Sequence, residues 1–309
     1  MEAAVEITEL SKSYGALKAL DNVTLTIEKG SMVSIVGPDG AGKTTLIKLL
    51  CGILDPGGGK IKILGFDVQR QYDEVKKHIG YLSQTFTLYG DLSIDENLEF
   101  FAEVHRVRNY KKRRDELLAF TRLKPFRDRL ADRLSGGMKQ KLALACTLIH
   151  SPEVIFLDEP TTGVDPVSRR EFWIILAGLL QRDITVVMTT PYMDEAERSS
   201  LVGMLFGGRL VLSGSPEHLR GLFPGTLVEV VVDDVRKAGK VLRTHRAYPD
   251  VELFGDRLHV ARKKGDGDIG EIKKILEAAG IAVENIRAVT PSLENVFISF
   301  IKKEARVSV

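Results

Sequence analysis

The chain has 309 residues, of which 44% are hydrophobic and 28% are charged, and its formal net charge is +2. This length allows one large and one small hydrophobic core to be buried. The nearly balanced charge implies no dominant electrostatic attraction to nucleic acid or to lipid.

Two further features of the sequence bear on location. No stretch approaches the roughly 18 consecutive apolar residues that a membrane span needs. The N-terminus also lacks the charged-then-apolar pattern of a signal peptide. We therefore expect a cytoplasmic chain, with any pore formed by another polypeptide.

Cys51 and Cys146 both fall on apolar helix faces, so we expect reduced core thiols and no disulfide framework.

Along the chain, roughly the first 80 residues are predicted to form short β-strands around a glycine-rich segment. This segment directly follows the apolar run Met32–Val36 and precedes an apolar helix over Leu46–Leu50. We call it the phosphate loop, and its residues are Gly37, Pro38, Asp39, Gly40, Ala41, Gly42, Lys43, Thr44 and Thr45. Its spacing, a glycine followed by four residues and Gly-Lys-Thr, is that of a P-loop.

Each residue type in the phosphate loop has a physical role in holding a chain of phosphates. Gly40 and Gly42 let the backbone curl so that successive N–H groups point at phosphate oxygens. Lys43 would neutralise the β- and γ-phosphates, and the Thr44 hydroxyl would reach Mg²⁺. The helix that starts near Thr44 presents its positive end to the same anion. A chance glycine-rich turn is the alternative, but the flanking strand and helix favour the binding of a nucleoside triphosphate.

A mostly helical lobe is predicted next, over residues 86–150. It begins with helices over Ser93–Phe101 and Lys111–Phe120. Near its end the segment Leu134–Gln140, with the sequence Leu-Ser-Gly-Gly-Met-Lys-Gln, opens a further helix that runs through Leu148.

The apolar run Val154–Leu157 predicts a buried parallel strand that ends in two carboxylates, Asp158 and Glu159. Ligand chemistry in open α/β sheets takes place at this edge. Asp158 is then placed to hold Mg²⁺, directly or through water, and Glu159 to orient or deprotonate an attacking water. Strand and helix patterns alternate over residues 154–190, as in a parallel sheet.

The phosphate loop, the Ser-Gly-Gly helix and the Asp-Glu strand resemble, in order and separation, the nucleotide-binding subunit of ABC transporters. The resemblance covers residues 1–222. It implies an α/β fold of the P-loop NTPase, ABC-ATPase type, with a mixed sheet core and a helical signature subdomain over residues 86–150. It also implies ATP and Mg²⁺ as cofactors. Tyr14 would otherwise be an ordinary surface aromatic, but its place shortly before the second strand, as in the family, favours stacking on adenine.

The resemblance assigns roles to single residues. The residues that would bind ATP are Tyr14, Gly37, Asp39, Gly40, Ala41, Gly42, Lys43, Thr44 and Thr45. The catalytic residues would be Lys43, Gln84 and Glu159, and the Mg²⁺ ligands Thr44, Gln84 and Asp158. The signature residues, which would close over the γ-phosphate bound by the opposite subunit, are Ser135, Gly136, Gly137 and Gln140. Asp165, in the sequence Gly-Val-Asp-Pro, matches the loop that touches the partner across the dimer.

One position departs from the family pattern. After the apolar strand Ile184–Met188 the family places a switch histidine that hydrogen-bonds the γ-phosphate, and here Pro191 stands at that position. Proline has no side-chain donor and no backbone N–H, and its φ is fixed. The residues that follow, Tyr192–Ala196, match the family, so a misalignment is not the cause.

Two interpretations of Pro191 follow. In the first, Glu159 suffices and the chain is a slower ATPase. In the second, the chain's own site is degenerate, and a second, complete subunit performs most of the turnover. We favour retained hydrolysis, because the general base and both phosphate-holding motifs are present.

After Gly225 the pattern becomes that of a small α+β domain, residues 226–301. The predicted strands are Leu227–Val232, two short strands within Val251–Val260, and Val283–Val289, and the predicted helices are Val235–Leu242 and Ile269–Ala279. This order suggests a ferredoxin-like domain. It resembles the C-terminal extension of ABC ATPases of drug, polysaccharide and sodium export, including the closing segment Pro291–Phe297. A dimer-contact or regulatory role is expected.

The resemblance thus predicts an ATP-hydrolysing subunit that energises transport, with export favoured by the C-terminal extension. Two such chains would sandwich two ATP molecules, as a homodimer or as a heterodimer with another ATPase subunit. Their closure would drive separate membrane-spanning subunits, and the chain would be peripheral on the inner face of the cell membrane. The alternative is a soluble ABC ATPase that acts on nucleic acid or ribosomes. Such chains carry a long heptad-patterned insertion or two cassettes, and since this sequence has neither, we expect no nucleic-acid partner.

Overall fold

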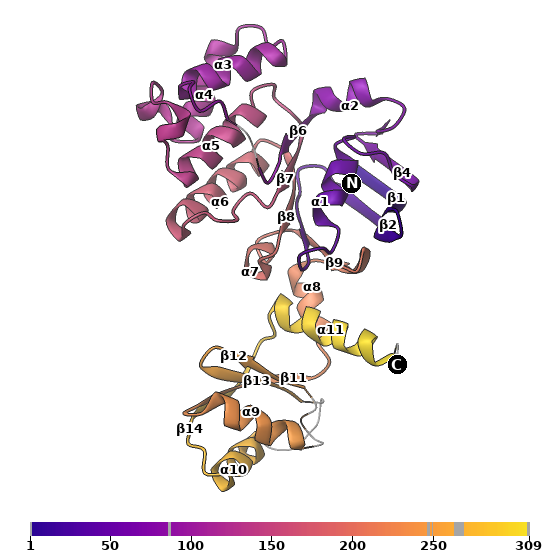
Figure 1. Cartoon of the computed structure of the whole chain (residues 1–309), viewed down its shortest axis with the longest axis vertical. Helices are drawn as coiled ribbons and strands as arrows, with labels where there is room; N and C mark the ends of the chain where they lie inside the picture. The colour runs from indigo at the N-terminus through magenta and orange to yellow at the C-terminus, as the bar shows by residue number, and fades with distance from the viewer. Residues whose placement is uncertain (1, 86–87, 246–247, 249, 263–268, 308–309) are drawn as a thin grey trace. The chain divides into compact units, whose positions relative to one another are not determined.

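A computed structural model describes residues 2–85, 88–245, 248, 250–262 and 269–307. The chain divides into two compact units, Met1–Ser215 and Pro216–Val309 (Figure 1). The boundary predicted from the sequence follows residue 222. Helix α8 (Pro216–Gly221) instead belongs to the second unit, where it packs against α11 (Leu293–Val307). Within the described ranges no helix combines the length and the apolar character that crossing a membrane requires.

A six-stranded sheet in the order β10-β9-β3-β8-β7-β6 forms the centre of the first unit (Figure 1). Its strands are β3 (Met32–Val36), β6 (Ile79–Leu82), β7 (Val154–Asp158), β8 (Thr185–Thr190), β9 (Leu201–Phe206) and β10 (Arg209–Gly214). β10 pairs antiparallel with β9, and the other pairs are parallel. Every residue of β3, β7 and β8 is buried, as parallel strands covered on both faces require.

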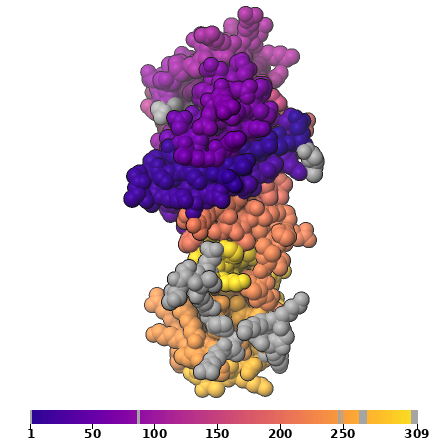
Figure 2. All heavy atoms as spheres, turned by 90° about the vertical axis from the view of Figure 1, so that its right-hand side faces the viewer, coloured from indigo at the N-terminus to yellow at the C-terminus, as the bar shows by residue number. Residues whose placement is uncertain are grey.

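An antiparallel sheet in the order β2-β1-β4-β5 completes the strands of this unit. Its strands are β1 (Ala3–Tyr14), β2 (Leu17–Glu28), β4 (Gly58–Ile63) and β5 (Phe66–Asp67). In Figure 2 the residues of β1 and β2 appear in indigo across the visible face. Helix α1 (Lys43–Leu50) shares one hydrophobic core with both sheets, because its Leu46, Ile47, Leu49 and Leu50 pack among residues of β1 and β3. This packing fixes the start of α1, where the phosphate loop ends.

Helix α2 (Tyr72–His78) was not predicted, because roughly the first 80 residues read as short strands alone. Acidic residues stand in its first turn and basic residues in its last, which suits the helix dipole. Lys76 and Lys77 also form ion pairs with Asp73 and Glu74, one turn away. In addition, β1 and β2, with 12 residues each, are longer than predicted.

The helical lobe contains α3 (Ile94–Val104), α4 (Tyr110–Phe120), α5 (Gly136–Thr147) and the short 3₁₀ segments Lys124–Phe126 and Ala131–Arg133. Together with α6 (Pro166–Leu180) these helices enclose a second hydrophobic core. A capping box starts α3: the Ser93 hydroxyl accepts from the Glu96 N–H, and the Glu96 carboxylate accepts from the Ser93 N–H. The Ser93 N–H lowers the pKa of the Glu96 carboxyl group. The predicted helices in this lobe are therefore confirmed, with small differences at their ends.

The second unit is a four-stranded antiparallel sheet in the order β12-β13-β11-β14. Its elements are β11 (Thr226–Val232), α9 (Val235–Thr244), β12 (Asp250–Phe254), β13 (Arg257–Arg262), α10 (Gly270–Ala278) and β14 (Val283–Val289). Residues of α9 and α10 pack on one face of this sheet in a separate core. The element sequence and the strand order are those of a ferredoxin-like fold, as predicted.

Candidate functional site

The phosphate loop connects the buried strand β3 to the start of α1. Gly42 is the N-terminal cap of α1 and has a φ of 104°, in the left-handed region that favours glycine. A Cβ atom on Gly42 would lie 2.5 Å from the Ala19 carbonyl oxygen, and one on Gly37 would lie 2.2 Å from the Leu205 carbonyl oxygen. The close approach of neighbouring backbone therefore excludes a side chain at Gly37 and at Gly42. Gly42, Lys43 and Thr44, at the N-terminus of α1, line the cavity that is described below, where the helix end favours an anion.

The Lys43 side chain lies within this loop and is only 4% exposed. Its Nζ donates hydrogen bonds to the carbonyl oxygens of Gly37 at 2.9 Å and Pro38 at 3.1 Å. The same nitrogen lies 3.2 Å from Glu159 Oε1 and 3.9 Å from Asp39 Oδ1. The loop carbonyls thus hold the Lys43 ammonium group toward the carboxylate at the end of β7.

Asp158, the last residue of β7, is 1% exposed. Its Oδ1 accepts hydrogen bonds from the hydroxyl groups of Thr44 at 3.2 Å and Thr189 at 2.7 Å. Its Oδ2 is buried and has no hydrogen-bond partner among the described residues. A buried carboxylate oxygen without a donor is unfavourable. Hydroxyl and carboxylate oxygens are ligands that Mg²⁺ prefers, so Thr44 and Asp158 fit a magnesium ion.

Glu159 follows at the carboxyl edge of the sheet with a φ of 48°, an unusual conformation for a residue other than glycine. Such backbone strain concentrates at functional sites. The turn is held by the Glu159 N–H, which donates to Thr189 Oγ1 at 3.0 Å. Glu159 Oε2 accepts from the Gln84 amide at 3.1 Å, so the carboxylate lies between Lys43 and Gln84.

Thr189 is a residue of this site that sequence reasoning missed. It is the fifth residue of β8, is fully buried, and contacts Asp158 through its side chain and Glu159 through both its hydroxyl and its carbonyl oxygen. The signal in the sequence was the pair of hydroxyl residues, Thr189 and Thr190, that follows the apolar residues Val186, Val187 and Met188 of the same strand. Without knowing that β8 neighbours β7, that signal carried no meaning.

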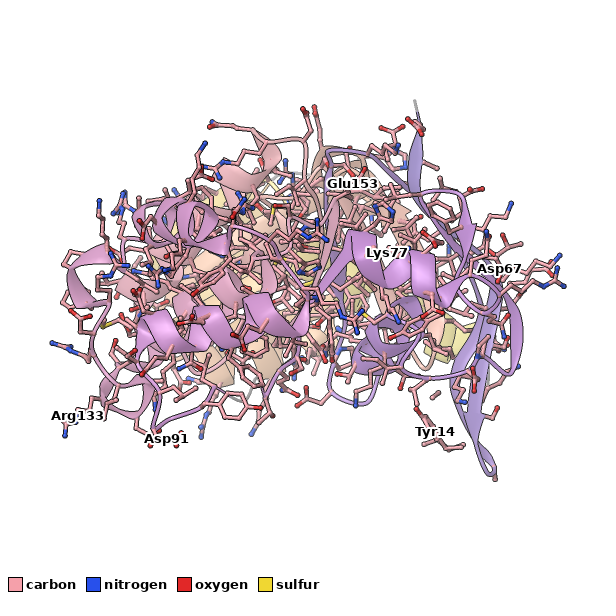
Figure 3. All side chains as sticks on the ribbon, turned by 90° about the horizontal axis from the view of Figure 1, so that it is seen from above. Tyr14, Asp67, Lys77, Asp91, Arg133 and Glu153 are labelled. Carbon is pink, nitrogen blue, oxygen red and sulfur yellow. The ribbon has the colours of Figure 1, made fainter. Side chains whose placement is uncertain are left out.

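A cavity of about 690 Å³ opens in front of these residues, within the size range of small-molecule sites. The predicted residues that line it are Tyr14, Asp39, Gly40, Gly42, Lys43, Thr44, Thr45, Gln84 and Glu159. Tyr14 ends β1 and is 48% exposed, and Figure 3 shows it close to the β1–β2 hairpin. Lys18 and Gly207 also line the cavity and were not predicted. Three other predicted residues do not line the cavity. Gly37 and Ala41 lie within the phosphate loop, and Asp158 accepts a hydrogen bond from Thr44, which does line it.

The signature residues lie away from this cavity. Gly136 and Gln140 line a separate cavity of about 450 Å³, and Gln84 is the one described residue that lines both cavities. Ser135 is exposed and caps α5 by accepting from the Met138 N–H at 3.4 Å. A Cβ on Gly137 would lie 2.2 Å from the Ser168 hydroxyl, so α5 and α6 approach closely there. Within one chain the signature does not reach the phosphate loop's cavity, in keeping with a role toward another subunit.

Asp165 and Pro191 occupy two loops next to the site. Asp165 caps α6 by accepting from the Ser168 and Val167 N–H groups at 3.0 and 3.1 Å, and the hydrogen bonds from Ser168 lower the pKa of its carboxyl group. Pro191 directly follows β8, and it is neither fully buried nor fully exposed. Its neighbour Thr190 donates a hydrogen bond to the buried Glu195 and accepts one from the Tyr192 N–H. Glu195 is a second residue whose position the sequence did not reveal.

Comparison with known proteins identifies the family. The family model described as "ABC transporter" matches residues 20–162. The chain is 40% identical to the "Probable multidrug ABC transporter ATP-binding protein YbhF" of Escherichia coli (strain K12) over 71% of this chain, and it spans 38% of the length of YbhF. It is 34% identical to the daunorubicin resistance ATP-binding protein DrrA3 of Streptomyces coeruleorubidus, over 99% of this chain and 98% of that protein.

A solved structure shows the same fold. The ATP-binding cassette MJ0796, determined as a dimer in a post-hydrolysis state with ADP and Pi, matches with a TM-score of 0.62 and 28% identity. The match covers 68% of this chain and 98% of MJ0796. Because a full-length relative, a family model and the fold agree with the motifs of the phosphate loop and the Asp-Glu strand, the chain belongs to the ATP-binding subunits of ABC transporters.

Proposed function

We propose that this chain binds ATP with Mg²⁺, hydrolyses it, and thereby energises export through separate membrane-spanning subunits. The observation that carries the proposal is the meeting of Lys43, Glu159 and Gln84 in one cavity at the carboxyl edge of the parallel sheet. A cation for the phosphates, a carboxylate base and an amide that orients it are the groups that hydrolysis of a phosphoanhydride needs.

The phosphate loop and its neighbours would bind the nucleotide. The N–H groups at the start of α1 and the Lys43 ammonium group would hold the β- and γ-phosphates. Thr44 and Asp158 would hold Mg²⁺, since their oxygens adjoin and Asp158 Oδ2 lacks a protein donor. When bound, the metal would neutralise charge on the phosphates. Tyr14 would stack on the adenine at the open end of the cavity.

Hydrolysis would use Glu159 as the general base. The Gln84 amide holds Oε2 and the Lys43 ammonium group lies 3.2 Å from Oε1, so both oxygens of the carboxylate are positioned at the cavity that Glu159 lines. A water oxygen would bond to the γ-phosphorus while its proton passes to Glu159 Oε1. The bond between the γ-phosphorus and the bridging oxygen would break, giving ADP and phosphate. Lys43 would stabilise the charge that develops on the phosphoryl oxygens.

Two chains would combine to complete each site. The exposed Ser135 hydroxyl offers an O–H donor and the first residues of α5 offer N–H donors, and they lie apart from the cavity of the chain's own phosphate loop. They would therefore be available to a γ-phosphate held by a second subunit. Asp165, with its ionised carboxylate at the start of α6, would contact the partner. The similarity to MJ0796, whose structure is dimeric, supports this assembly.

Export is supported by the names of the relatives. They include the daunorubicin resistance protein DrrA3 and the bacitracin transport ATP-binding protein BcrA of Bacillus licheniformis, which is 30% identical over 97% of this chain. Both similarities extend through the ferredoxin-like unit, for which we propose a dimer-contact or regulatory role. The chain would then be peripheral on the cytoplasmic face of the membrane through its transporter subunits.

A second candidate function rests on Pro191. If hydrolysis needs a side-chain donor at this position, the chain's own site turns over slowly. It would then serve a complete ATPase partner mainly through Ser135 and Gly137, which are intact. The two functions differ in whether a homodimer hydrolyses ATP at a useful rate.

The first prediction tests Glu159 as the base. Glu159→Gln keeps the size of the side chain but not its basicity, so we expect turnover to fall by about 10²-fold or more while ATP binding persists. ATP-bound dimers should accumulate, as measured by size-exclusion chromatography with light scattering. Glu153→Gln, an exposed carboxylate that pairs with His78, is the matched control. Retained turnover in Glu159→Gln would show that water is activated elsewhere.

The second prediction concerns Pro191. Pro191→His should raise the ATPase rate of the isolated chain, by up to about 10²-fold, because it restores a donor to a developing charge. Pro191→Ala is the control: it gives the backbone the same freedom without a donor. A rate in Pro191→His equal to or below that of the parent, with normal ATP affinity, would show that Pro191 is compatible with full catalysis.

The third prediction concerns the partner. Purification of the tagged chain from detergent-solubilised membranes should bring down a protein with several apolar spans, identified by mass spectrometry, and the amount should depend on ATP. Recovery of the chain only from the soluble fraction, bound to ribosomes or nucleic acid, would instead support an ABC ATPase that is not coupled to a pore.

A further inference from the structure

Glu195 is a buried carboxylate that neither the phosphate loop nor the Asp-Glu strand explains. It lies in the short helix α7 (Met193–Ala196) and is 2% exposed. The Thr161 hydroxyl lies 2.7 Å from its Oε1 and 2.9 Å from its Oε2, and the Thr190 hydroxyl donates to Oε2 at 2.7 Å. We call Glu195, Thr161 and Thr190 the threonine clasp.

The two threonines lie at the ends of the neighbouring strands β7 and β8, one just after Glu159 and the other just before Pro191. Thr161 stands two residues after Glu159, in the loop that leaves β7. Thr190 ends β8 and immediately precedes Pro191, and its hydroxyl also accepts from the Tyr192 N–H at 3.1 Å. The threonine clasp therefore joins the loop that follows Glu159 to the turn at Pro191.

Arg169, on helix α6, closes the arrangement from the other side. Its Nε lies 3.5 Å from Glu195 Oε1, and its guanidinium carbon lies 4.6 Å from the centroid of the Tyr192 ring. Both neighbours of Pro191 are therefore linked to Glu195. Thr190 donates a hydrogen bond to it, and Tyr192 stacks on Arg169, which lies beside Glu195. Through α6 the same contacts reach Asp165, the cap of that helix.

A buried carboxylate at position 195 lowers the stability of the fold unless other interactions compensate for it. Burying a carboxylate is unfavourable unless its partners compensate, and apolar replacements of buried ion pairs are often neutral for stability. Here two of the partners are neutral hydroxyl groups, and the cation is 29% exposed. The strands β7 and β8 are already joined by parallel pairing up to Asp158 and Thr189. What the pairing does not fix is the geometry of the loops beyond those residues.

We propose that Glu195 is a positioning residue for ATP hydrolysis: through Thr161 and Thr190 it fixes the distance between the Glu159 loop and the Pro191 turn. This inference rests on the proposed ATPase function. Since Pro191 has no side-chain donor and no N–H, it cannot donate a hydrogen bond to a phosphate, and its contribution depends on where its turn lies. That position depends on the clasp.

Glu195→Gln tests the proposal, since a glutamine keeps the size but replaces one accepting oxygen with an NH₂ group that repels the donated hydroxyl hydrogens. We expect kcat to fall by roughly 10- to 100-fold, the scale of a misplaced catalytic group, while the Kd for ATP stays within about twofold. Asp194→Asn, the exposed neighbour with the same change of charge, should leave both values unchanged.

A second pair of variants keeps the test valid if Glu195→Gln does not fold. Thr161→Val removes the hydroxyl at constant shape and should lower kcat in the same way, whereas Thr161→Ser should restore it. In the double variant Glu195→Gln with Thr161→Val the losses in kcat should not add, because Thr161→Val removes a contact that Glu195→Gln already disturbs.

The outcomes separate this proposal from the proposed function. If the parent chain hydrolyses ATP but folded Glu195→Gln and Thr161→Val keep its kcat, the clasp is structural and the proposal is overturned. If Thr161→Ser is as slow as Thr161→Val, the hydroxyl is not the cause and the proposal also fails. If the parent chain itself hydrolyses no ATP with any partner subunit, the proposed function fails, and the clasp with it.

Discussion

The site depends on the position of β8 between β3 and β7. Parallel pairing sets Val36 of β3 beside Thr190, and Asp158 of β7 beside Thr189. Because parallel strands end at the same edge of a sheet, the phosphate loop, the two carboxylates and the Pro191 turn all emerge there. This arrangement brings Thr44 and Asp158, which are 114 positions apart in the sequence, within hydrogen-bonding distance.

Within that frame the buried charges stabilise one another's positions. Lys43 is held by two loop carbonyls and faces Glu159, while Thr189 bonds both acidic residues. Isolated charges with so little exposure would be strongly unfavourable. The uncompensated Asp158 Oδ2 is the exception, and it lies where a divalent cation would bind. The arrangement suits a polyanion, and the family to which the chain belongs binds ATP.

The motif residues were predictable because their chemistry is local: the glycines of the phosphate loop, its lysine, and the acids that end an apolar strand follow from spacing alone. The ferredoxin-like order of residues 226–301 was predictable from alternating patterns. Thr189, Thr161 and Glu195 were not, since their partners lie on other strands and loops and a hydroxyl residue has no periodic signature. Helix α2 was missed because its seven residues are mostly polar and charged and only Val75 is buried.

The most direct test of the account is equilibrium binding of ATP with Mg²⁺, measured by titration calorimetry on the parent chain, Lys43→Ala and Lys48→Ala. Both lysines lie on α1, but only Lys43 faces the cavity. We predict that the parent and Lys48→Ala bind ATP with the same affinity. Lys43→Ala should show no detectable binding, because the bound triphosphate loses its main counter-charge. Equal affinity in Lys43→Ala would contradict the assignment of this cavity to the nucleotide.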